Sequence, residues 1–302
     1  MGGVSEAEAG DSHTEDIRVM TVSRFGVKLE EETLIRKVRR IPAQGEVFVD
    51  VGDAVEAETV IAGGTVRNPE AVEVKVFAKL GVEPNQTERY MLKKEGDQVK
   101  KDEVIAIYRA FFGRFTKACR SPMDGFIEVF AKSAGRVIVR GNPIPVEVKA
   151  HIPGRIVEVI PGEGAVVETR GALVNGVFGV GGEARGELVF AVDRPGEALT
   201  TEVMREGYEG KILVGGSVVT LDALRKAAEM GVNGIVTGGV DQKDLTDFLG
   251  QEIGLGVTGT ESVGLTLIIT EGFGVYPMRD ETFRLLKSHE SKSASIDGTT
   301  QI

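Results

Sequence analysis

From Ile17 onward the chain alternates apolar and polar residues, and one pattern recurs three times, over residues 45–61, 92–105 and 154–168. Each copy combines an alternating strand, a tight turn at Gly-Asp or Gly-Glu, an inward valine and a second apolar strand. Alternation with a period of two buries one face of a strand. Gly-Asp supplies the positive φ and the side-chain cap of a close reversal. The pattern therefore predicts three β-hairpin units, and residues 121–129 form a fourth half-copy.

Between the first two copies the spacing of the apolar residues changes. Residues 72–80 (VEVKVFAKL) predict a helix that ends at Gly81, and Pro84 begins a second short turn that reaches Tyr90. We therefore expect a helical insert over residues 70–91 of the β region.

After Gly210 short apolar strands alternate with amphipathic helices. The expected strands cover residues 211–214, 235–237 and 265–270, and the expected helices cover 221–230, 243–249 and a stretch that runs through His289. Strands that alternate with helices are typical of a parallel sheet with helices packed on it. The C-terminal part is therefore predicted to be a small α/β domain with a mostly parallel sheet.

The expected fold class is α+β and multi-domain, with β-rich hairpin units followed by the α/β domain. The predicted parts are a disordered tail (1–14), a β region (15–193), a linker (194–210) and the α/β domain (211–302). Apolar–polar alternation resumes at the last residues, as expected if the sequence is a piece of a longer protein.

Composition narrows the function classes. The net charge of −10 and a pI near 5.1 argue against nucleic acid or an anionic membrane as the main partner, since both need a basic face. No apolar run approaches the ~18 residues of a membrane span, and no basic-then-apolar signal opens the chain. The single cysteine, Cys119, suits a reducing compartment, so we expect a cytoplasmic protein without membrane insertion.

Cys119 itself allows two interpretations. Lys117 and Arg120 flank it and could lower the pKa of its thiol. The alternative, which we favour, is an ordinary half-buried strand residue.

The second copy resembles the biotinyl/lipoyl attachment superfamily. Its Gly96-Asp-Gln-Val-Lys-Lys…Val-Ile105 is similar to the first half of the superfamily motif, and Ser121-Pro-Met-Asp-Gly125 is similar to its closing turn. The resemblance implies a barrel-sandwich hybrid, a flattened barrel of short antiparallel strands, over roughly residues 41–192. The first two copies also resemble the barrel-sandwich domain in one subunit of the membrane ferredoxin–NAD oxidoreductases.

Carriers in this superfamily present a lysine at a hairpin tip. Counting forward from Gly96, that position falls on Phe112; counting back from Pro122, it falls on Arg114. Neither side chain supplies the nucleophilic amine that an amide to biotin or lipoate needs. Lys117 lies where carriers have already entered the returning strand. We therefore expect no covalent biotin or lipoate and no other cofactor.

The same hairpin is a candidate docking site. Phe111, Phe112, Arg114 and Phe115 would form an exposed tip that contacts a partner. Alternatively, the phenylalanines fold back as core residues. Both interpretations remain open at this point.

A second candidate site is the edge of the α/β domain where strands end and helices begin. In open α/β sheets, ligands bind there against backbone N–H groups. The candidate ligand-binding residues are Gly215, Gly216, Ser217, Thr237, Gly238, Gly239, Asp241, Glu271 and Gly272. The plainer alternative is that Ser217, Thr220 and the two acids are helix or turn caps.

No catalytic constellation is visible, and His151 has no second histidine at ligand spacing, so no metal site is expected. Two functions remain. The first, which we favour, is a non-catalytic binding or assembly protein with a protein partner or self-association. The alternative is an enzyme or sensor that binds a small phosphate- or carboxylate-bearing ligand at the glycine loops.

Overall fold

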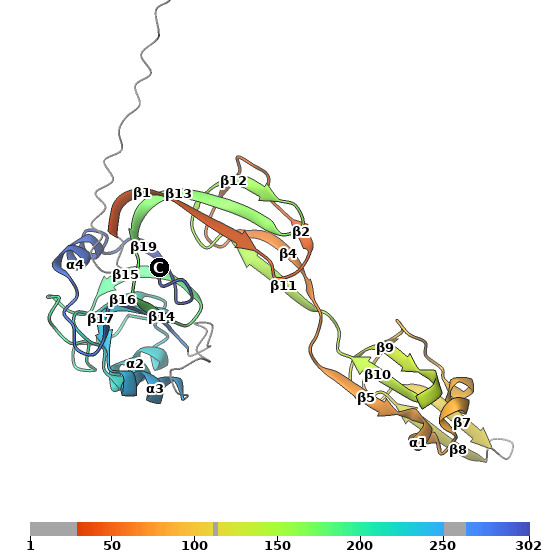
Figure 1. Cartoon of the computed structure of the whole chain (residues 1–302). Coiled ribbons are helices and arrows are strands. Elements are labelled where there is room, and N and C mark those ends of the chain that lie inside the picture. The colour runs from red at the N-terminus through yellow and green to blue at the C-terminus, as the bar shows by residue number, and fades with distance from the viewer. Residues whose placement is uncertain (1–28, 111–113, 251–263) are drawn as a thin grey trace, which may run out of the picture. The chain divides into compact units, whose positions relative to one another are not determined.

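The computed structural model describes residues 29–110, 114–250 and 264–302 of the 302-residue chain. It is β-rich and contains several sheets (Figure 1). The predicted tail, residues 1–14, lies outside the described residues. The chain divides into two compact units. The hairpin unit comprises Val38–Ala150 and Arg155–Val167, and the C-terminal unit comprises residues up to Lys37, His151–Gly154 and Glu168–Ile302.

Two long strands, β1 (Leu29–Arg40) and β13 (Gly164–Val174), each begin in one unit and end in the other. This division differs from the boundary predicted at 194–210. The reason is that the strands following Glu168 pair with the C-terminal strands, which period-two alternation alone does not reveal.

The hairpin unit is built mainly from short strands. These are β2 (Gly45–Val47), β3 (Ala54–Val55), β4 (Val60–Val66), β5 (Ala71–Lys75), β6 (Gln98–Val99), β7 (Val104–Ala110), β8 (Phe115–Arg120), β9 (Gly125–Ala131), β10 (Arg136–Arg140), β11 (Ile144–Lys149) and β12 (Gly154–Ile160). Its helices are α1 (Val76–Leu80) and the 3-10 turns η1 (Pro84–Tyr90) and η2 (Lys132–Ala134). The strand orders are β1-β13-β12-β3, β11-β4-β2 and β5-β10-β9-β6, with β7-β8 as a separate two-stranded ribbon.

The first two sequence repeats form the same turn. The carboxylate of Asp53 accepts a hydrogen bond from the N–H of Asp50 (2.9 Å), and that of Asp97 accepts one from the N–H of Lys94 (2.7 Å). The glycine before each aspartate has a positive φ, +99° and +87°. The predicted Gly-Asp turn is therefore confirmed in both copies.

The later repeats supply the strands that complete these turns. The N–H of Gly52 donates to the carbonyl of Ile156, and the N–H of Gly96 donates to that of Ile127, both at 2.8 Å. Ile156 belongs to the third copy and Ile127 to the fourth half-copy. The first and third copies therefore pair with each other, and so do the second copy and the fourth half-copy. The second of these pairs lies in the sequence between the two members of the first.

The helix predicted over residues 72–80 is wrong for its first half. Residues 71–75 form β5, which pairs antiparallel with β10, with Val72 opposite Val139 and Val74 opposite Val137. Alternating β-branched residues fit this pleat better than a helix. Only α1 is helical, and it ends at Gly81 with φ +70° as predicted.

The C-terminal unit contains one six-stranded sheet. Its strands are β14 (Phe178–Val180), β15 (Glu183–Phe190), β16 (Ile212–Val214), β17 (Gly234–Val240), β18 (Thr266–Phe273) and β19 (Ser293–Asp297), and its helices are α2 (Leu221–Glu229), α3 (Gln242–Leu249) and α4 (Asp280–Lys287). The order is β14-β18-β17-β16-β15-β19. Strands β15 to β18 pair in parallel, whereas β14 and β19 pair antiparallel.

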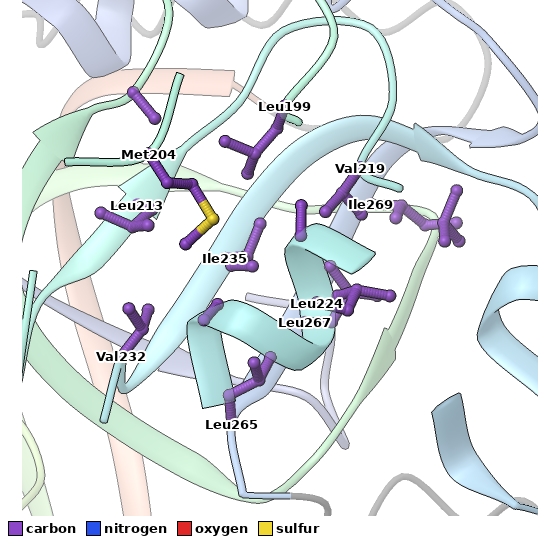
Figure 2. Close-up of a cluster of buried hydrophobic side chains, with 14 of the residues drawn as sticks. Leu199, Met204, Leu213, Val219, Leu224, Val232, Ile235, Leu265, Leu267 and Ile269 are labelled. Carbon is purple, nitrogen blue, oxygen red and sulfur yellow. The ribbon is translucent and has the colours of Figure 1, made fainter. Parts of the chain in front are cut away.

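Alternate residues of the central strands face two separate apolar clusters. Leu213, Ile235 and Leu267 point toward α2 and α3, as Figure 2 shows for the cluster that contains Leu224. The intervening strand residues pack with Phe283 of α4 on the opposite face. Every residue of β17 is buried, as expected for a central strand with helices on both faces.

The segment predicted as a linker, 194–210, is packed instead. Leu199, Met204 and Tyr208 are buried in the α2–α3 cluster. Leu199 also donates its N–H to the carbonyl of Val218 (2.7 Å). In the sequence, the apolar–polar alternation stops here, which suggested a boundary. The cause is instead an irregular backbone, whose buried apolar side chains do not follow the period of a strand.

Glycine brings the two ends of this sheet together. Gly298, just after β19, lies against β14: a Cβ built on Gly179 of β14 would lie 2.5 Å from the carbonyl oxygen of Gly298. A Cβ on Gly298 would lie 2.6 Å from the carbonyl carbon of Val180, so a larger residue does not fit. The sheet therefore curls into a half-barrel.

Candidate functional site

The β7–β8 hairpin has a defined register that places its tip. Ala110 pairs with Phe115, so residues 111–114 connect the two strands. Phe111 and Phe112 lie outside the described residues. Arg114 is exposed, and Phe115 is 67% exposed, the largest exposure among the phenylalanines that the structure describes. For Phe115, the core alternative is therefore wrong.

Lys117 lies in the returning strand and not at the tip. It pairs with Tyr108, two positions below the Ala110–Phe115 pair. Its Nζ lies against the end of α1, where a Cβ built on Gly81 would be 2.5 Å away. The position expected for Lys117 from the sequence is thus confirmed.

The base of the hairpin is anchored in the core of the hairpin unit. Ile105, Ala106 and Cys119 are completely buried, and the rings of Tyr90 and Tyr108 meet edge to face at 5.1 Å. Burial raises the pKa of the Cys119 thiol, so the alternative of an activated thiol is wrong. The base of the hairpin is therefore anchored, whereas Arg114 and Phe115, where its second strand begins, are exposed.

At the predicted glycine edge, the backbone segments bind one another. Gly215 donates its N–H to the carbonyl of Val236 (2.8 Å), Ser217 to Glu197 (2.8 Å) and Gly238 to Gly216 (2.9 Å). These N–H groups are the ones an anion would need. The structure brings these candidate residues together, but their N–H groups already donate to carbonyl groups of the protein.

The glycines permit close backbone approach. Gly238 and Gly239 lie within β17, not in a loop after it. A Cβ on Gly239 would lie 2.8 Å from the carbonyl oxygen of Gly272, and one on Gly216 would lie 2.7 Å from that of Arg194. A Cβ on either glycine would therefore overlap the neighbouring backbone.

The two acids of this edge have structural partners. Asp241 is the N-cap of α3 and accepts from the N–H groups of Lys243 (2.8 Å) and Asp244 (3.4 Å). Glu271 accepts from the N–H of Arg279 and forms an ion pair with its Nε at 3.1 Å. Asp241 acts as the cap that the plainer interpretation predicted.

The three hydroxyl residues at this edge have different environments. Ser217 is buried and is not a helix cap; Thr220 caps α2 by accepting from the N–H of Ala223 (3.3 Å). Thr237 is completely buried, and its Oγ1 has no hydrogen-bond partner in the part of the chain that the structure describes. An unpaired buried hydroxyl is costly, and Thr87 and Thr282 have the same feature elsewhere in the described residues, away from this edge.

A group of ion pairs around the buried carboxylate of Asp297 was not foreseen from the sequence. The Nζ of Lys37 lies 3.0 Å from Asp297 and 3.1 Å from Glu183, and Nδ1 of His151 lies 3.8 Å from Glu183. Burial alone would raise the pKa of Asp297, but hydrogen bonds from Thr299 and Lys37 hold it well below its usual range. No spacing signal links these residues, because each comes from a different segment.

Within residues 29–110, 114–250 and 264–302, no group of three or more His, Cys, Asp or Glu side chains is arranged to hold a metal ion. Among the helices that the structure describes, none is long and apolar enough to cross a membrane. Comparisons with protein-family models, with curated proteins and with solved structures found no match to this chain.

Proposed function

We propose that this protein is a non-catalytic binding or assembly protein, and that its β7–β8 hairpin contacts a protein partner or a second copy of the chain. The observation that carries the proposal is the exposure of Phe115 beside Arg114 on a hairpin whose base is rigidly anchored. Aromatic and arginine side chains supply much of the binding free energy at protein interfaces. An anchored hairpin loses little conformational entropy on binding.

We further propose that the hairpin unit is a barrel-sandwich hybrid of the biotinyl/lipoyl-like type without a carrier function, and that the C-terminal unit is a separate α/β domain. The matched Gly-Asp turns at residues 50–53 and 94–97 support the first assignment. Lys117 in mid-strand, packed against α1, supports the absence of biotin or lipoate. A cytoplasmic location fits the buried Cys119 thiol.

The test is site-specific photo-cross-linking in cells. A benzophenone amino acid replaces Phe115 in the full chain, and a matched control carries it at Ile144, a partly exposed residue of β11 in the same unit. We expect discrete adducts from position 115 that are absent from position 144. No adduct at position 115, or the same adducts from both positions, would rule the proposal out.

One observation favours a second candidate, a small anionic ligand at the glycine edge. The buried Oγ1 of Thr237 has no hydrogen-bond partner among the residues that the structure describes, and a ligand oxygen could supply one. Phosphate at ~100 times its Kd would then stabilise the protein by about 2.7 kcal/mol. Thr237→Val, which keeps the shape and removes the hydroxyl, should abolish that thermal shift. No shift in the wild-type protein would exclude this candidate.

A further inference from the structure

The chain separates its charges along the sequence. Residues 71–140, which include the β7–β8 hairpin, contain fourteen Lys and Arg against nine Asp and Glu, although the whole chain has a net charge of −10. Residues 41–70 have the opposite charge balance, with six acidic residues and one arginine. The average charge therefore conceals one basic and one acidic region within the hairpin unit.

The hairpin is the most one-sided part of the basic region. Its described residues, 104–110 and 114–120, contain four cations and no acid. The four are exposed and have no carboxylate within ion-pair distance among the described residues: Arg109, Arg114, Lys117 and Arg120. Several acids of the same region already pair with other cations: Glu73 with Arg136, Glu88 with Lys132, Glu103 with Lys93 and Glu128 with Arg140. The positive charge of the hairpin is therefore not neutralised locally.

The acidic region carries the charge opposite to that of the hairpin, together with exposed apolar side chains. Five acids are exposed around β2 and the turns that follow it: Glu46, Asp50, Asp53, Glu56 and Glu58. Among them lie two exposed apolar side chains, Phe48 (53% exposed) and Val51 (64%). The ring of Phe48 lies over Gly63, where a Cβ would be 3.0 Å from the ring edge. An anchored, exposed apolar centre with an acidic surround complements Phe115 and its cations.

We infer that the basic β7–β8 hairpin of one copy docks head to tail on the acidic face of a second copy, the surface made by residues 46–58. This inference rests on the proposed binding function and names the partner. If the hairpins of two copies docked on each other, like charges would come together. The acidic face instead supplies opposite charges and an apolar contact for Phe115. Because the two surfaces differ, the contact is heterologous and either closes into a ring or continues into an open assembly.

The first measurement is sedimentation velocity of the full chain at increasing protein concentration. We expect concentration-dependent association at about 0.1 M salt that is largely lost at about 1 M, where the screening length falls from roughly 10 Å to about 3 Å. A wild-type protein that stays monomeric at millimolar concentration and about 0.1 M salt would overturn the inference.

Two double variants then separate the surfaces. The hairpin variant is Arg109→Glu with Arg114→Glu, and the face variant is Glu46→Lys with Glu56→Lys; none of these side chains has a structural partner among the described residues. Each should weaken association at least about tenfold. The matched control, Lys94→Glu with Lys101→Glu, makes the same charge change in the basic region outside the hairpin and should associate like the wild type.

Mixing the two variants is the decisive step. The face variant keeps an intact hairpin, and the hairpin variant keeps an intact acidic face, so the mixture should associate although neither variant associates by itself. A mixture that stays monomeric, or association that survives the face variant, would overturn the inference. If position 115 cross-links only to a different protein, the inference fails while the proposed binding function stands.

Discussion

Gly238 provides the sharpest test of why glycines gather at the edge of the C-terminal sheet. Replacing it with alanine adds a Cβ that would overlap the carbonyl oxygen of Tyr276 and lie 2.7 Å from that of Gly216 and 2.9 Å from the N of Met278. All three neighbours are backbone atoms, so no side-chain rotation relieves the contact. Two segments of chain must move apart within a buried region.

Overpacking a buried site costs about 1–3 kcal/mol. Alanine in a strand recovers about 0.5–1 kcal/mol of conformational entropy relative to glycine, so a net loss of about 1 kcal/mol is expected. For a unit of this size that loss lowers the Tm by roughly 2–4 °C. The matched control is Gly182→Ala, because no atom lies within 4 Å of its Cβ position. It should leave the stability unchanged or slightly raised.

The assay is thermal and urea unfolding of the two variants beside the wild type, followed by circular dichroism. If Gly238→Ala unfolds within about 0.5 kcal/mol of wild type, the close-approach argument is refuted. The same result would revive a ligand-binding role for this glycine. Equal destabilisation by Gly182→Ala would show that the loss is not specific to close packing.

Four further outcomes are expected. Asp297→Asn should lower the free energy of unfolding by about 2 kcal/mol near neutral pH, because it weakens the charge-assisted hydrogen bonds that the buried carboxylate accepts from Lys37 and Thr299. Since the folded-state pKa of Asp297 is depressed, the difference from wild type should persist above about pH 4 and shrink as the pH falls below that value; a difference independent of pH down to about 2 would contradict this. The thiol of Cys119 should resist a disulfide reagent in the native protein and react only on unfolding, and stoichiometric native reaction would show that it is accessible. Intact mass after coexpression with biotin and lipoyl ligases should show no added group, and a modification at Lys117 would overturn that expectation. Limited proteolysis should spare residues 194–210, since three of their apolar side chains are buried, whereas early cleavage there would restore the linker interpretation.

Local patterns determined much of the architecture. Gly-Asp turns were predictable because only glycine readily takes a positive φ and aspartate caps the reversal, and both turns form as expected. Helices α2 and α3 followed from spacing and capping residues, with Thr220 and Asp241 at their N-termini. The position of Lys117 outside the hairpin tip followed from counting residues. These features depend on neighbours within a few positions in the sequence.

Tertiary structure decided the rest, because the partners are distant in sequence. β5 is a strand only because β10 pairs with it. From the sequence, the glycines of the C-terminal sheet were predicted to bind an anion. In the structure they allow close contacts between distant segments, such as Gly238 with Tyr276, and no local pattern predicts those contacts. The charge cluster of Lys37, Glu183 and Asp297 joins three segments, and a carboxylate becomes a buried ion-pair partner only when folding removes its water.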